Sequence, residues 1–213
     1  MMIKKGYFQF LLLLFLLLPI VVHAQQTVYD NLVADVQKVK ATTKVDRNDR
    51  RILELLNKMY MEVLQADNGS LSKGTIDEIK AFQNDCSLAN RHIFYLFQRY
   101  QSLIEAGQSK PEESNCNLQI ALMKVLSREL FDLYNEIPPI ICIYMGEALM
   151  SAGLREDAKT HFTQSLVFYP NSVPLKVYKY LLTDNESEKR RLFKELTEKH
   201  PNHWMVKRNL KGD

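Results

Sequence analysis

The chain is poor in the residues that interrupt regular structure, because its 213 residues include only seven glycines and seven prolines. Proteins built from β-strands need many glycine-rich turns. No stretch alternates apolar and polar residues for long enough to predict a strand. The glycines and prolines fall mainly between segments with helical periodicity. The sequence therefore predicts an all-α fold built from antiparallel helical hairpins.

Neither sign of charge is in large excess, since 28 Lys and Arg oppose 25 Asp and Glu for a formal net charge of +3. The densest basic run, residues 189–191, is offset by Glu186, Glu188 and Glu195. Binding to nucleic acid calls for a basic face, and none stands out. We expect residues 189–191 to lie on a solvated helix face and predict no nucleic-acid partner.

Motifs for catalysis are also missing. The sequence has no Gly-rich phosphate loop, no nucleophile elbow and no Cys-x-x-Cys pair. His200 and His203 lie on either side of Pro201, and the glutamate of a metalloprotease motif is missing between them. We therefore expect both histidines to be surface residues of a turn. His161, beside Phe162, is expected to be exposed or at the edge of a groove. We therefore predict no catalytic residue, no metal and no cofactor.

Cysteine is scarce, with Cys86, Cys116 and Cys142 allowing at most one internal disulfide. An oxidising compartment would permit one such pair. Cys86 and Cys142 occupy apolar helix positions, which favours three buried free thiols instead. The sequence leaves both alternatives open.

One long hydrophobic run is present, near the N-terminus. Lys4 and Lys5 precede an apolar stretch over residues 7–22, which ends at Val22-His23-Ala24. This order is typical of a secretory signal peptide, and the run is short for a hydrocarbon core of about 30 Å. We predict a signal peptide over residues 1–24, cleaved after Ala24, and no stable membrane span afterwards. The leader resembles those of exported proteins of Gram-negative bacteria, so a periplasmic or secreted location is expected.

Residues 25–138 are predicted to form an N-terminal helical region. Apolar periodicity indicates helices over 27–40, 47–66 and 117–134, and a capping-box pattern at residues 75–78 opens a long helix to about residue 106. Asn84-Asp85 could divide that helix. If the helix is undivided, it is expected to pack along its whole length, either within the molecule or against a second copy in a dimer. The packing surface would be a heptad-spaced seam of Ile79, Phe82, Cys86, Ala89, Ile93, Leu96, Tyr100 and Leu103.

The C-terminal third has the clearest local signals. Helical pairs are expected at 140–151 with 155–168 and at 173–183 with 187–199, followed by a short helix over 202–210. The small residues Gly146 and Ala158 stand where two helices must cross closely, Phe162 fills the space between them, and Pro170 ends the second helix. Such a unit must stack on neighbours to bury its apolar face.

Residues 139–172 resemble one tetratricopeptide repeat of 34 residues, with Gly146, Ala158, Phe162 and Pro170 at the family's positions. Cys142, Met145 and Ser165 stand where the family often has Trp, Leu and Ala. A weaker unit follows, in which Phe193 and Pro201 lie 31 residues beyond Phe162 and Pro170. The resemblance implies a TPR-like α-solenoid over residues 139–213, and residues 25–138 could be degenerate repeats.

In this family the first helix of each pair lines a concave groove that binds another protein or peptide. The resemblance therefore implies an exported, non-catalytic scaffold or adaptor of the bacterial cell envelope. The groove candidates that it implies are Ile143, Glu147, Met150, Val177 and Leu181. The N-terminal helices could instead cap the groove and bury these residues.

A second class of function stays open from sequence. A helical enzyme or small-ligand carrier could use an internal cavity in the aromatic-rich segment that holds Phe94, Tyr95, Phe97 and Tyr100. Packing in an ordinary core explains those residues equally well. A homo-oligomer is compatible with either function.

Overall fold

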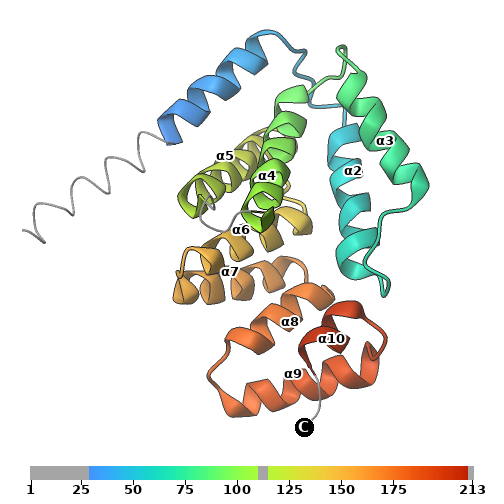
Figure 1. The fold of residues 1–213 in the computed structure, drawn as a ribbon, viewed down its shortest axis with the longest axis vertical. Coiled ribbons are helices and arrows are strands. Elements are labelled where there is room, and N and C mark those ends of the chain that lie inside the picture. Colours follow the sequence, from blue (N-terminus) through green and yellow to red (C-terminus); the bar gives the residue numbers. More distant parts are fainter. Residues whose placement is uncertain (1–28, 110–114, 211–213) are drawn as a thin grey trace, which may run out of the picture.

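The computed structural model describes residues 29–109 and 115–210, which contain helices and no strand (Figure 1). The predicted all-α fold is thereby confirmed. The predicted signal peptide, residues 1–24, lies outside the described residues. Within them, no helix combines the length and the apolar character that crossing a membrane requires.

The first helix covers residues 29–41. It is followed by α2 (Arg51–Met59), which continues into a π-helical turn η1 (Tyr60–Gln65), and then by α3 (Lys73–Asn84), α4 (Arg91–Ser109) and α5 (Cys116–Tyr134). The C-terminal part contains α6 (Pro139–Ser151), α7 (Arg155–Phe168), α8 (Val173–Leu182), α9 (Glu186–Lys199) and α10 (Trp204–Asn209). The bounds of α6 to α9 agree with the predicted pairs to within one residue.

The predicted long helix from residue 75 is divided, as the Asn84-Asp85 alternative anticipated. Helix α3 ends at Asn84 and α4 begins at Arg91, because Asp85 accepts hydrogen bonds from Ser87 and Asn90 adopts a left-handed φ of 60°. The prediction of one continuous heptad-spaced seam is therefore wrong. The start of α3 also differs, since Ser72 caps it by accepting a hydrogen bond from the backbone N–H of Thr75.

From α4 onward, each helix packs against the next one in the chain, through to α9. The loops that start α6, α8 and α10 recur regularly, with N-caps at Pro138, at Ser172 34 residues later, and at His203 after a further 31. The intervals between these N-caps equal the 34- and 31-residue spacings noted in the sequence.

Helix α2 and η1 run along this series of helix starts (Figure 1). Near the beginning of α2, Arg50 pairs with Glu136 at 2.8 Å. In η1, the Gln65 side-chain oxygen accepts from the N–H of Val173 at 3.1 Å. Also in η1, the carbonyl of Val63 accepts a hydrogen bond from the Trp204 indole N–H at 3.0 Å. One helical segment thereby contacts the starts of the α6–α7 and α8–α9 hairpins and of α10.

The turn after η1 needs glycine where it meets α10. Gly69 has a φ of 62°, and a Cβ there would lie 2.9 Å from the ring of Trp204. His203 is also fixed at this junction, because its Nε2 donates to the Leu64 carbonyl at 2.9 Å while Nδ1 accepts from the Met205 N–H. His203 is 1% exposed, so its prediction as a surface residue was wrong: it is a buried N-cap.

A single apolar core crosses residue 138, the boundary proposed between the two regions. It extends from Leu32 of the first helix to Leu182 of α8. The aromatic segment of α4 belongs to it, with Phe94, Phe97 and Tyr100 at most 3% exposed and only Tyr95 at the surface. A smaller cluster, including Val177 and Leu196, joins α8 to α9 and α10.

Candidate binding sites

An apolar pocket of about 340 Å³ lies between α5 and α7, with Cys142 of α6 among its lining residues. Phe131 of α5 and Phe168 of α7 also line it, and they remain 53% and 78% exposed. Polar groups around it include Asn135, Glu136 and Gln164. We call this the α5–α7 pocket. It combines exposed aromatic rings with a few hydrogen-bonding groups, the usual composition of a recognition site.

The cysteine and histidine in the α5–α7 pocket do not form a nucleophile pair. The His161 Nε2 is hydrogen-bonded to the backbone carbonyl of Cys142 at 2.7 Å. Burial raises the pKa of the Cys142 thiol to about 11, and burial also lowers the pKa of His161. Neutral forms of both groups are therefore favoured, whereas an activated cysteine needs a stabilised thiolate. The arrangement suits binding rather than thiol chemistry.

All three cysteines are described, and none is in a disulfide. The expectation that all three would be buried is wrong: Cys86 is exposed, and Cys116 and Cys142 are only partly buried. The reason is the break after α3: Cys86 lies in the segment between α3 and α4 instead of on a continuous apolar helix face.

The five predicted groove residues separate into two groups. Ile143 and Val177 are fully buried and so cannot line an exposed groove. Their burial follows from packing, since Ile143 belongs to the main core and Val177 packs with α9 and α10 residues in the smaller cluster. Glu147, Met150 and Leu181 keep some exposure, with Met150 at 36%.

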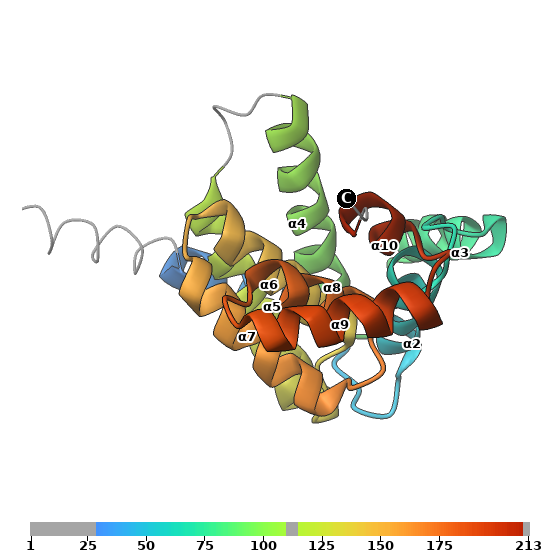
Figure 2. The same ribbon diagram turned by 90° about the horizontal axis from the view of Figure 1, so that it is seen from below.

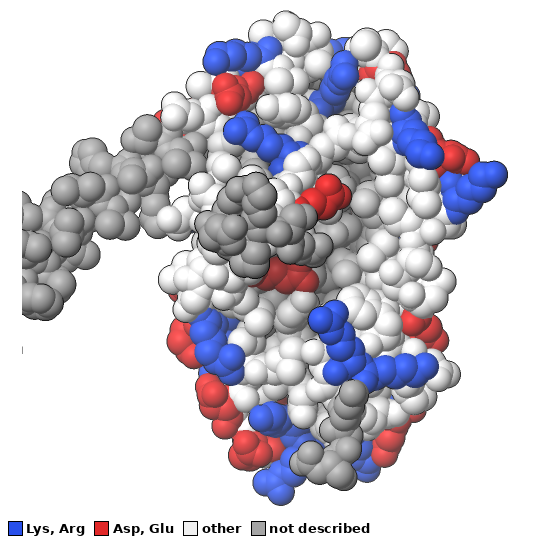
Figure 3. Space-filling view, in the orientation of Figure 1, with Lys and Arg blue, Asp and Glu red and all other residues white. Residues whose placement is uncertain are grey.

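Glu147 lies among tyrosines at the face formed by α4, α6 and α8. The Tyr178 hydroxyl of α8 donates to its carboxylate, and the Tyr100 hydroxyl of α4 donates to the carbonyl of Tyr144 at 3.0 Å. Figure 2 shows α4 and α10 rising on two sides of α6 and α8. Figure 3 shows Lys and Arg side chains interspersed with Asp and Glu side chains over the surface seen in Figure 1.

The protonation of Glu147 is expected to make stability depend on pH. Burial raises its pKa above the ordinary 4.5, although the hydrogen bond from Tyr178 acts in the opposite direction. The folded state then holds this proton more tightly than the unfolded state, so the stabilisation is complete below pH 4.5 and is lost as pH rises through the folded-state pKa. Glu147→Gln should remove this decline in the free energy of unfolding, measured by urea denaturation across pH.

The matched control for that measurement is Glu186→Gln, the same change at an exposed position in the first turn of α9. It should leave the decline in place. A Glu147→Gln profile that runs parallel to the parent's across the whole pH range would show that Glu147 is not the responsible group.

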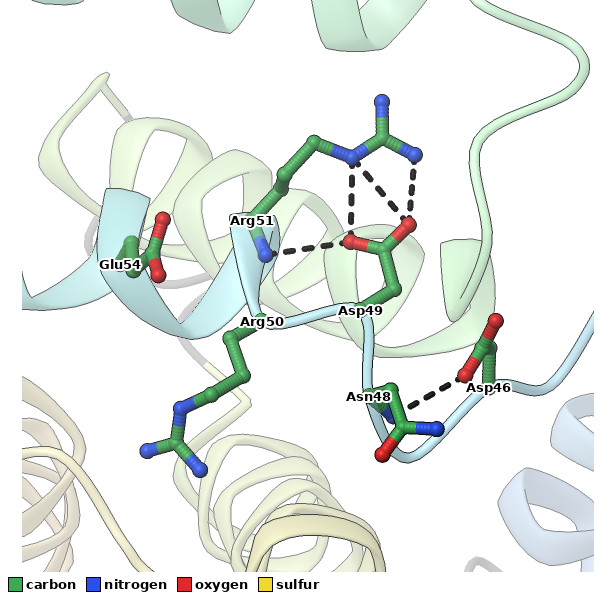
Figure 4. A pocket seen from close by; sticks show the side chains of 6 residues that line it. All are labelled: Asp46, Asn48, Asp49, Arg50, Arg51 and Glu54. Carbon is green, nitrogen blue, oxygen red and sulfur yellow. Dashed lines mark hydrogen bonds and ion pairs between the residues drawn. The ribbon is translucent and has the colours of Figure 1, made fainter.

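A wider hollow of about 490 Å³ lies beside the loop before α2, lined by Asp46, Asn48, Asp49, Arg50, Arg51 and Glu54. Asp49 and Arg51 pair with each other (Figure 4), since Asp49 accepts two bonds from Arg51 Nε at 3.0 and 3.2 Å and one from Nη2 at 2.6 Å. Asp46 and Arg50 form ion pairs with Lys44 and Glu136, which do not line the hollow. The Arg51 guanidinium accordingly lowers the pKa of Asp49. Because most charged groups that line this surface hollow already form ion pairs, few of them are available to bind a ligand.

The residues assigned to the repeat pattern lie at helix contacts and turns. Ala158 and Phe162 are fully buried, and Phe162 packs against Gly146. Phe193 lies 6.1 Å from the ring of Tyr180. Pro170 and Pro201 follow the ends of α7 and α9. Sequence reasoning did not select Phe131 or Phe168, because the first belongs to an apolar helix and the second to a predicted helix end.

Comparisons of the chain with protein-family models, with curated proteins and with solved structures each gave no match.

Proposed function

We propose that this chain is an exported, non-catalytic protein of the bacterial cell envelope that binds another protein through the α5–α7 pocket. Its role would be that of a scaffold or adaptor. The observation that carries the proposal is the exposure of the Phe131 and Phe168 rings at the rim of this pocket. Large apolar side chains grouped at a pocket commonly mark an interaction surface. The occupant would be an apolar side chain of the partner, with Gln164 and Asn135 placed to bond its backbone.

The proposal includes a TPR-like arrangement of residues 139–210. The recurrence of helix starts at Pro138, Ser172 and His203 supports it, as does the packing of each helix on its neighbours in the chain. The binding surface differs from the groove that the family resemblance implies, since Ile143 and Val177 are buried. Export depends on the predicted signal peptide; a mature protein that begins at Gln25 in a periplasmic fraction would support it.

Serine substitutions in the rim should weaken binding without unfolding the protein. Phe131→Ser and Phe168→Ser each remove an exposed ring, so stability should change by no more than about 0.5 kcal/mol. Together they should weaken the complex by roughly 30-fold or more, the loss expected when central aromatic anchors are removed. A photo-crosslinking amino acid at position 164, in cells, would capture the partner, and calorimetry with that purified partner would measure the affinity.

Val167→Ser is the matched control. Val167 is 76% exposed and adjacent to Phe168 but does not line the pocket. It should bind the partner like the parent protein. Equal affinities for the parent, the double phenylalanine variant and Val167→Ser would rule out the α5–α7 pocket as the binding surface.

A further inference from the structure

We propose, resting on the function proposed above, that the partner segment held by the α5–α7 pocket carries an arginine directly beside its apolar side chain. The exposed rings of Phe131 and Phe168 supply apolar surface for the partner's side chain. The charge and the helix ends that line the same pocket are negative, and they favour a cation next to that side chain.

Residues from two helix C-termini line the α5–α7 pocket. Phe131 and Asn135 belong to the last turn and the C-cap of α5. Phe168 and Tyr169 are the last residue and the C-cap of α7. The final carbonyls of a helix have no amide partner within that helix, and they carry a partial negative charge. Neither helix has Lys or Arg in its last turn, so a cation supplied by the partner would be stabilised at both ends.

Glu136 adds a full negative charge to this pocket. Among the described residues that line it, Glu136 is the one acidic residue and none is Lys or Arg. Arg50, outside the pocket, donates to Glu136 Oε2 at 2.8 Å, which leaves Oε1 to accept from a second cation. Burial lowers the pKa of His161, so this lining histidine stays neutral and does not repel the cation.

An acidic partner residue would find few hydrogen-bond donors in the pocket. Three side chains that line it already donate to backbone carbonyls: His161 Nε2 at 2.7 Å, the Tyr169 hydroxyl at 2.5 Å and the Ser165 hydroxyl at 2.9 Å. The side-chain amides of Asn135 and Gln164 accept as well as donate. Arginine fits these acceptors best, because its planar guanidinium has five N–H donors and also stacks on aromatic rings.

The test titrates the isotopically labelled full chain with three peptides, each made in both residue orders. They are acetylated dipeptide amides of leucine with arginine, with citrulline, which is the neutral isostere of arginine, and with glutamate. The side-chain amide resonances of Asn135 and Gln164 report on the pocket that these residues line. In at least one order, the arginine peptide should bind about fivefold more tightly than the citrulline peptide, the gain expected for a cation beside helix C-termini. The glutamate peptide should bind most weakly.

Two variants with matched controls identify the source of this preference. Val167→Lys places a cation in the last turn of α7, at an exposed position that does not line the pocket. It should weaken the arginine peptide about threefold and leave the citrulline peptide unchanged, whereas Val167→Ser should change neither. Glu136→Gln should also reduce the preference about threefold. Glu156→Gln, exposed in the first turn of α7, should not. Circular dichroism checks the folding of each variant.

The failure of this inference can be distinguished from a failure of the pocket itself. Equal affinities for the arginine and citrulline peptides, both lost in the Phe131→Ser, Phe168→Ser double variant, would overturn the arginine and leave the pocket standing. A preference for arginine that neither Val167→Lys nor Glu136→Gln reduces would also overturn it. Peptide binding that the double variant does not change would instead contradict the pocket as the binding surface. Absence of a shift with every peptide would overturn the arginine, and the rim variants with the captured partner would still test the pocket.

Discussion

Gly146→Ala is expected to destabilise the protein by about 3 kcal/mol, near the upper end for overpacking a core. A Cβ at Gly146 would lie 2.1 Å from the Cζ of Phe162 and within 2.7 Å of two further ring atoms. The ring cannot retreat, because its other side stacks on Tyr178 with a centroid separation of 4.5 Å and an interplanar angle of 3°. Thermal and urea denaturation would measure the loss.

Three further variants serve as controls for that experiment. Gly74→Ala should be neutral or slightly stabilising, because a Cβ there meets only the Ser72 hydroxyl at 3.9 Å and alanine favours helix. Phe162→Ala should cost about 3–5 kcal/mol through the cavity that it leaves. The double variant Gly146→Ala with Phe162→Leu should cost less than the sum of its single changes. Strict additivity would mean that the two residues do not share one packing site.

The C-terminal hairpins could be predicted because their signals are local. Pro139 at the start of α6, and Ser172 and Asn185 as the caps of α8 and α9, mark helix starts in the sequence itself. The small residue Gly146 and the large residue Phe162 also indicated where the two helices meet. Helix bounds and close crossings therefore followed from residue type and spacing alone.

The surface of the hairpins could not be predicted in the same way. Burial of Val177 depends on α9 and α10, and the pocket around Phe168 depends on α5, which is distant in sequence. The family pattern identifies the helix of a hairpin on which a residue lies, but it does not say which other segment covers it. Sequence reasoning consequently selected Glu147 and Met150, which remain partly exposed, but did not select Phe131 or Phe168 at the rim of the α5–α7 pocket.

Besides the local signal at Asn84-Asp85, the break between α3 and α4 has a long-range cause. Asn90 is fully buried, and its amide accepts from the N–H of Asp46 at 2.9 Å. The amide nitrogen lies within hydrogen-bond distance of the carbonyls of Asp46 and Asp49, at 2.8 and 3.0 Å, and of the Tyr134 hydroxyl at 2.9 Å. Its two hydrogens are shared among these acceptors. One side chain thus fixes the loop before α2 to the start of α4 and the end of α5.

Asn90→Ala should therefore cost about 3 kcal/mol or more in the free energy of unfolding. Buried backbone groups would lose their partners, at about 1–3 kcal/mol for such a group, and alanine is disfavoured at a φ of 60° by about 1–2 kcal/mol. Asn90→Gly removes the second cost and keeps the first, so it should recover only part of the loss. Urea denaturation of both variants separates the hydrogen bonds from the backbone conformation.

Asn135 provides the matched control, because it has a similar φ of 54° but is exposed at the end of α5. Asn135→Ala should cost only the conformational part, about 1–2 kcal/mol, and Asn135→Gly should be close to neutral. If Asn90→Ala and Asn135→Ala proved equally destabilising, the buried hydrogen bonds of Asn90 would contribute nothing to the break between α3 and α4. A larger loss at Asn90 that glycine only partly restores is the result that a long-range polar anchor requires.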